Sequence, residues 1–149
     1  MKLQILKKEN LIETEIDIRY SNMTQSLNSI IQYIRQQEYL IQGTFDNKLY
    51  QIPLNKILYF ETVDKRTFIY TQQKIFECKK KLSVIEQDLI KANIIRISKT
   101  VLLNISCLAC VKPYPNHRLL AELNNKENLI VSRKYISSLR DKIRSAYYE

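Results

Sequence analysis

The chain has 149 residues, enough for one domain with its own hydrophobic core or one domain with a short appendage, and too few for a second full domain. A formal net charge of +9 at pH 7 favours a polyanionic partner, either nucleic acid or an acidic membrane surface. No stretch approaches the roughly 18 apolar residues of a membrane-spanning helix, and the charged N-terminus does not resemble a signal peptide, so we expect a soluble, cytoplasmic protein.

The N-terminus is predicted to form a β-hairpin. Residues 3–7 and 14–20 alternate apolar with polar side chains, the pattern of strands that bury one face. The apolar members are Leu3, Ile5, Ile16, Ile18 and Tyr20. We therefore expect two short strands joined by a turn.

A helix is predicted next. Asn22 or Thr24 can cap it, and it should end near Gln37. Its apolar side chains recur at the spacing of one buried stripe, formed by Leu27, Ile30, Ile31 and Ile34. Hairpin and helix make a ββα extension over residues 1–45. We interpret it as packing against the main domain, with a regulatory contact surface as the alternative.

The main domain, residues 46–145, is predicted to be mainly β, with a tail over residues 146–149. The lone glycine, Gly43, and the Asp46-Asn47 pair mark the junction because these residues tolerate turn geometry. Short runs of β-branched and aromatic residues between polar turns predict its strands. We expect strands over residues 49–52, 57–62, 68–71, 75–79, 94–97, 101–103, 105–111, 118–123 and 129–131.

Two helices belong to this domain. Ser83 and Glu86 have the spacing of a capping box, for a helix that runs to about Lys91. Ser132 can cap the last helix, whose expected inward side chains are Tyr135, Ile136, Leu139 and Ile143. In the turn over residues 124–127, asparagine is expected to adopt the left-handed backbone. The predicted fold class is mainly β with a few short helices.

The stretch from Asn93 to Ser106 places a polar turn between two buried strands. The turn residues are Arg96, Ser98, Lys99 and Thr100. A basic, hydroxylated turn on a rigid frame can offer donors to phosphates or base edges. A solvated turn without a function is the alternative.

Three motifs in order resemble a LytTR-type DNA-binding domain. They are Ile57-x-Tyr59-x-Glu61, Arg96-Ile97 with Asn104, and Val131-Ser132-Arg133-x-Tyr135, spread over roughly 100 residues. The resemblance implies a stand-alone bacterial transcription regulator. It also implies an elongated stack of small antiparallel sheets that inserts loops into successive major grooves, independently of a helix-turn-helix.

The resemblance also suggests which residues contact DNA. Three base-reading positions of the family fall on Lys65, Lys99 and Arg133, where some members carry histidine at the first and asparagine at the second. We expect contacts to the DNA backbone from neighbouring residues on the same loops. These are Arg66, Arg96, Ser98, Thr100, Arg118, Ser132 and Lys134. The alternative for Arg133 is an ion pair with Asp141 or Glu86.

An enzyme is not expected. The single histidine, His117, has no matched nucleophile, and one glycine cannot build a phosphate-binding loop. Cys107 and Cys110 have redox or metal spacing but lack the second ligand pair of a zinc site. A thiol enzyme is therefore a distant alternative, and no metal or other cofactor is predicted.

The predicted partner is double-stranded DNA, at repeated sites and with a dimer on DNA as one arrangement. The resemblance also implies a membrane-bound antagonist protein, which would contact the ββα extension. The competing function is a basic interaction module that binds RNA or an acidic protein.

Overall fold

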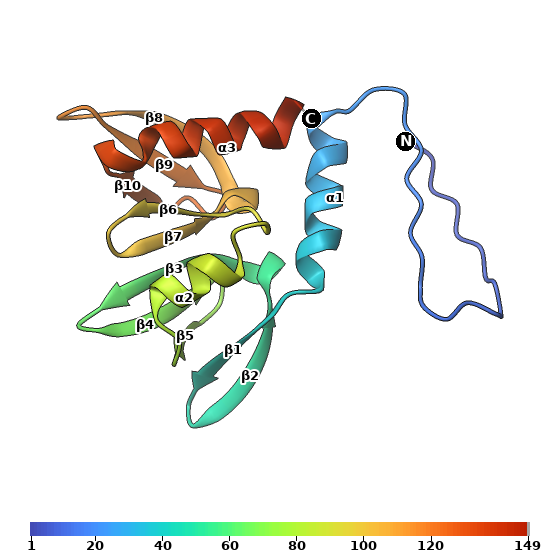
Figure 1. Cartoon of the computed structure of the whole chain (residues 1–149), viewed down its shortest axis with the longest axis horizontal. Helices are drawn as coiled ribbons and strands as arrows, with labels where there is room; N and C mark the ends of the chain where they lie inside the picture. Colours follow the sequence, from blue (N-terminus) through green and yellow to red (C-terminus); the bar gives the residue numbers. More distant parts are fainter. Residues whose placement is uncertain (149) are drawn as a thin grey trace.

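The computed structural model describes the chain through residue 148, with side chains through residue 145 (Figure 1). Regular structure begins only at residue 25. In order, the elements are α1 (Gln25–Gln37), β1 (Leu40–Phe45), β2 (Lys48–Pro53), β3 (Ile57–Val63), β4 (Arg66–Thr71), β5 (Ile75–Cys78), α2 (Leu82–Asp88), β6 (Ile94–Ser98), β7 (Val101–Asn104), β8 (Leu108–Tyr114), β9 (Arg118–Leu123), β10 (Asn128–Val131) and α3 (Ile136–Tyr148). Short 3-10 turns lie at Leu54–Lys56, Ile105–Cys107 and Arg133–Tyr135.

The strands form two antiparallel sheets. One has seven strands in the order β2-β1-β5-β4-β3-β7-β6, and the other has three in the order β10-β9-β8. The mainly β fold class predicted from the sequence is confirmed.

Strand β7 is buried along its whole length because both faces of the large sheet are covered there. Leu102 packs in a core cluster with Ile85 of α2 and with Leu89, the residue after α2. Its neighbour Leu103 packs in a second cluster with Leu139 of α3 and residues of the small sheet. Successive side chains of a strand point to opposite faces, so one short apolar run supplies both cores.

The predicted N-terminal hairpin is wrong. Residues 1–22 contain no strand, none of residues 1–20 is buried, and Figure 1 shows this segment running out from the body of the protein and back. Two apolar arms gain little from pairing with each other when no third strand or helix covers them. The helix prediction is confirmed, with Thr24 as N-cap and Gln37 as last residue. However, Ile30 on its predicted buried stripe is 39% exposed.

Strand β1 replaces the predicted junction. Gly43 lies mid-strand without a left-handed backbone, and a Cβ there would come within 2.8 Å of the Phe76 Cβ. Close packing, rather than turn geometry, therefore requires glycine. The turn residues Asp46 and Asn47 join β1 to β2 with positive φ. The boundary predicted between the extension and the main domain, after residue 45, falls between β1 and β2 of this hairpin. The division of the chain into these two parts remains a prediction.

The two helix caps predicted within the main domain are wrong. Lys81 is the N-cap of α2 and Ser83 lies inside the helix, while Glu86 is drawn to Arg96. Ser132 precedes a 3-10 turn and makes no side-chain cap bond, because α3 starts only at Ile136. In the β9–β10 turn the left-handed residue is Lys126 rather than an asparagine. Finally, α3 continues to Tyr148, past the start of the predicted tail.

Candidate nucleic-acid interface

One edge of the molecule, at the left of Figure 1, carries the β3–β4, β6–β7 and β8–β9 turns and the start of α3. The β3–β4 and β6–β7 turns share this edge because β3 pairs antiparallel with β7, with Glu61 opposite Val101. The Thr62 N–H donates to the Thr100 carbonyl at 2.9 Å, which joins the two turns directly. The Ser132 N–H donates to the Ile97 carbonyl at 2.9 Å, which places the segment before α3 beside them.

The three predicted base-reading cations occupy this edge with free side chains. Lys65 lies in a two-residue turn in which it and Asp64 both have positive φ, the hairpin geometry that matches strand twist. Lys99 lies in the β6–β7 turn, and Arg133 lies in the 3-10 turn before α3. All three are exposed, and among the described side chains none of them forms a hydrogen bond or ion pair. They can therefore bind an anion without breaking an internal bond.

Arg96 is held inside the protein instead. Its side chain is 17% exposed, and its Nε donates to Glu86 Oε2 at 2.9 Å. Its Nη1 donates to the Lys99 carbonyl at 2.7 Å. Arg96 thus ties the β6–β7 turn to α2. This geometry favours a positioning role for Arg96 over a phosphate contact. It also removes Glu86 as a partner for Arg133.

Two further predicted cations are engaged at the surface. Arg66 donates through Nε and Nη2 to the two carboxylate oxygens of Glu77 at 2.9 and 2.6 Å, and this bond lowers the Glu77 pKa. Arg118 donates to the Pro115 carbonyl at 3.0 Å and stacks over the Tyr114 ring at 4.8 Å. Arg66 thus links β4 to β5 and Arg118 holds the β8–β9 turn, while the Arg66 side chain remains 60% exposed.

The remaining predicted contacts lie on the same edge. Thr100 is exposed, and its N–H donates to Ser98 Oγ at 3.3 Å, which stabilises the turn. Lys134 is exposed, 5.6 Å from the Tyr135 ring centroid. Ser132 is half-buried and contributes its backbone bond to β6.

A buried pair of amides behind this edge was missed by sequence reasoning. Asn104, at the end of β7, donates to the Ile57 carbonyl at 2.8 Å and the Leu54 carbonyl at 3.2 Å. Gln36 of α1 donates to Asn104 Oδ1 at 3.0 Å and to the Ala92 carbonyl at 2.8 Å. Both side chains are almost fully buried. The sequence analysis included Asn104 in a family motif without predicting its buried hydrogen bonds. Gln36 lies on a helix face of polar residues, and no pattern in the sequence indicated that it is buried.

The stacked pair Tyr59 and Tyr70 is not an exposed platform for single-stranded nucleic acid. Tyr59 and Tyr70 stack with ring centroids 4.3 Å apart, but Tyr59 is buried and burial raises its pKa. Exposed, sequence-tolerant stacking surfaces are what single-strand binders use. This pair serves the core instead.

The cysteines do not form a reactive centre. Burial raises the pKa of Cys107 to about 11, so its thiol stays protonated and unreactive near neutral pH. Cys110 is exposed on β8. Within the described residues, no cluster of His, Cys, Asp and Glu could hold a metal ion.

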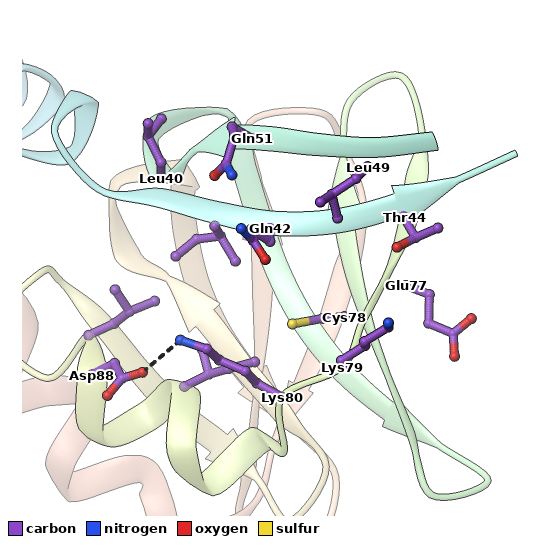
Figure 2. A pocket seen from close by; sticks show the side chains of 13 residues that line it. Leu40, Gln42, Thr44, Leu49, Gln51, Glu77, Cys78, Lys79, Lys80 and Asp88 are labelled. Carbon is purple, nitrogen blue, oxygen red and sulfur yellow. Dashed lines mark hydrogen bonds and ion pairs between the residues drawn. The ribbon is translucent and has the colours of Figure 1, made fainter. Parts of the chain in front are cut away.

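A cavity of about 460 Å³ lies between the β1–β2 hairpin and α2 (Figure 2). Cys78 and Ile85 contribute to its wall, and Lys80 bonds to Asp88 at 3.2 Å beside it. Cys78 has a pKa raised by burial, so this wall offers no activated nucleophile. None of Lys65, Lys99 and Arg133 lines it.

No helix among the described residues is long and apolar enough to cross a membrane.

Comparisons with known proteins identify a DNA-binding domain family and relatives named as transcriptional regulators. A family model described as the LytTr DNA-binding domain matches residues 47–144. The chain is 26% identical over 145 residues to an uncharacterized HTH-type transcriptional regulator of Staphylococcus aureus strain bovine RF122 / ET3-1, covering 96% of this chain and 98% of the relative. A second such regulator, from strain NCTC 8325 / PS 47, is 25% identical with the same coverage.

One solved structure shares the fold. It is the LytTr DNA-binding domain of a protein from Bacillus cereus, with a TM-score of 0.67 and 23% sequence identity. The match covers 71% of this chain and 97% of that chain.

Proposed function

This chain belongs to the LytTr DNA-binding domain family, and from that premise we propose that it is a sequence-specific transcription regulator that reads double-stranded DNA with basic loops. In this proposal Lys65, Lys99 and Arg133 read base edges in successive major grooves. The observation that carries it is that these side chains, on one edge of the fold, have no internal partner among the described residues.

The helices support loop reading over a helix-turn-helix. Strands β1 to β5 separate α1 from α2, and β6 to β10 separate α2 from α3, so among the described residues no two α-helices follow each other through a short turn. This arrangement of helices differs from a helix-turn-helix, although the Staphylococcus aureus relatives are named HTH-type regulators. The turns that carry Lys65 and Lys99 and the segment with Arg133 are the exposed basic elements that we propose to enter the grooves.

Arginine and lysine suit different parts of this task. The Arg133 guanidinium can donate two parallel bonds to guanine O6 and N7, whereas Lys65 and Lys99 each present a compact ammonium that serves a base or a phosphate. Arg66, Arg118, Lys134, Ser98, Thr100 and Ser132 would contact the phosphate backbone. Arg96 would hold the Lys99 turn in place from behind.

Salt dependence of binding tests the proposal. The operator is first selected from random duplexes, and its affinity is then measured over a series of salt concentrations. We expect log affinity to fall with log salt at about −0.9 per neutralised phosphate, with several phosphates contributing. A nearly flat response, or equal affinity for duplex DNA, single-stranded RNA and an acidic polypeptide, would refute it. The last outcome would favour the alternative, a basic interaction module.

Regulation and location complete the proposal. A regulator of this kind acts on DNA in the cytoplasm and carries out no catalysis of its own. A membrane-bound antagonist would hold it inactive through residues 1–45, whose N-terminal segment presents exposed apolar side chains such as Leu3 and Ile16. Deleting residues 1–22, which keeps α1 and the bond between Gln36 and Asn104, should then abolish co-purification with membranes and leave the rest folded. Equal membrane association of both forms would refute this antagonist.

A further inference from the structure

The N-terminal segment, residues 1–22, exposes more apolar surface than its surroundings explain. Met1, Leu3, Ile5, Leu6 and Ile12 are each at least 78% exposed, and none of residues 1–20 is buried. Large contiguous apolar patches on soluble proteins usually mark interaction sites. Figure 1 shows the segment as two arms that run out from the body and return to α1.

Apolar and polar side chains alternate along both arms, as they do in β-strands, but neither arm pairs as a strand in this structure. In the outgoing arm Leu3 and Ile5 share one face, and in the return arm Ile16, Ile18 and Tyr20 share one. A two-stranded hairpin is marginally stable alone, but three or more strands with a shared apolar face are stable. A partner that adds strands would therefore order the segment and cover its apolar faces.

The charges of the segment favour a second copy of the same chain as that partner. Residues 1–20 carry four cationic and four anionic side chains, in a protein whose net charge is +9. The outgoing arm carries the cations Lys2, Lys7 and Lys8, and Lys7 lies 4.0 Å from the Glu9 carboxylate. The return arm carries the anions Glu13, Glu15 and Asp17 and one cation, Arg19, so it stays net negative. A two-fold axis sets the outgoing arm of one copy against the return arm of the other, and both contacts are then complementary.

We propose that residues 1–22 are a dimerisation element in which the arms of two copies pair into one intermolecular sheet. Ile30 and Tyr33 of α1, the helix that follows the segment, are also 39% and 55% exposed. A strongly acidic partner would be repelled by the return arm, and nucleic acid would gain nothing from a segment without net charge. This inference does not depend on DNA binding and is tested without DNA.

The test measures the dimer dissociation constant of the full chain by sedimentation equilibrium. We expect a dimer at micromolar concentration and a monomer for Leu3→Ser with Ile16→Ser. The matched control is Leu49→Ser, which removes a 65% exposed leucine from β2 and should leave the dimer intact. Neither change touches the core, so thermal melting of the monomer should be unchanged.

Charge reversal then tests the pairing itself. Lys2→Glu with Lys8→Glu, or Glu13→Lys with Glu15→Lys, should each weaken the homodimer at least about tenfold, because attraction becomes repulsion at symmetry-related contacts. Mixing the two variants should restore dimerisation as a heterodimer, which pairing within one chain cannot do. A full chain that stays monomeric, alone or in the presence of membranes, would overturn the proposal. So would a mixture that dimerises no better than either variant.

Discussion

Replacing Arg133 with alanine tests whether it reads a base or only anchors the protein. Its guanidinium is exposed and has no partner among the described residues, so the substitution removes no internal bond. The free energy of unfolding should therefore change by less than about 0.5 kcal/mol. Losing a bidentate contact to guanine should cost about 1 to 3 kcal/mol on the operator, or about 5- to 150-fold in affinity.

The same substitution at Arg96 should behave differently. Arg96→Ala removes the bond to Glu86 at 2.9 Å and the bond to the Lys99 carbonyl at 2.7 Å, and it leaves Glu86 unpaired. We expect a loss of about 1 to 3 kcal/mol in the free energy of unfolding. Binding should weaken on every sequence, because the Lys99 turn loses its support.

The assay compares each variant on the selected operator and on a set of single-base changes, at fixed salt. For Arg133→Ala, discrimination should flatten at one base pair and stay intact elsewhere. Lys99→Ala should show a smaller bias, because one ammonium orients poorly against two acceptors. The control is Arg140→Ala, an exposed arginine within α3 and outside the turns that carry Lys65, Lys99 and Arg133, which should leave base discrimination unchanged.

An equal loss on operator and changed sites would make Arg133 a phosphate anchor, and the base-reading assignment taken from the family would be wrong. Strong destabilisation by Arg133→Ala would contradict the free guanidinium on which the magnitude rests.

Other predictions concern the frame behind the interface. Asn104→Ala should lower the free energy of unfolding by about 2 to 4 kcal/mol, because it leaves the Ile57 carbonyl and the Gln36 amide short of partners, and combining it with Gln36→Ala should cost less than the sum of the two changes; additive costs would show that the two amides are not coupled. Gly43→Ala should destabilise by about 1 to 3 kcal/mol because its Cβ would lie 2.8 Å from the Phe76 Cβ, and an unchanged melting temperature would contradict that packing. Cys107, with a pKa of about 11, should resist thiol reagents at pH 7 to 9 in the folded protein, and rapid labelling there would show that the thiol is not buried. A dimer would bind two operator copies together, so Leu3→Ser with Ile16→Ser should weaken binding to duplexes with two operator copies and leave single-copy binding unchanged. An equal loss of affinity on both duplexes would show that the substitutions act on DNA binding itself and not through dimerisation.

The sequence by itself determined the class of fold and most of its elements. Strand β9 has the predicted bounds, and α1 starts and ends where its cap and stripe indicate. These features depend on a residue and its near neighbours, through the alternation of a strand and the turn of a helix. The three motifs also located the turns that carry Lys65, Lys99 and Arg133.

Only the tertiary structure decided which of those patterns have partners. Residues 3–7 and 14–20 alternate like strands, but none of them is buried by the part of the chain that the structure describes. Gly43 stands in β1 because the Phe76 side chain, 33 positions away, needs the space.

The same distinction separates the cations. Arg96 and Arg133 both stand in motifs, yet Glu86 and the Lys99 carbonyl hold the first and no described residue holds the second. A local pattern fixes the preferred backbone and the residue type. Whether a strand edge or a charged group remains free depends on segments distant in the chain, and only their packing brings these together.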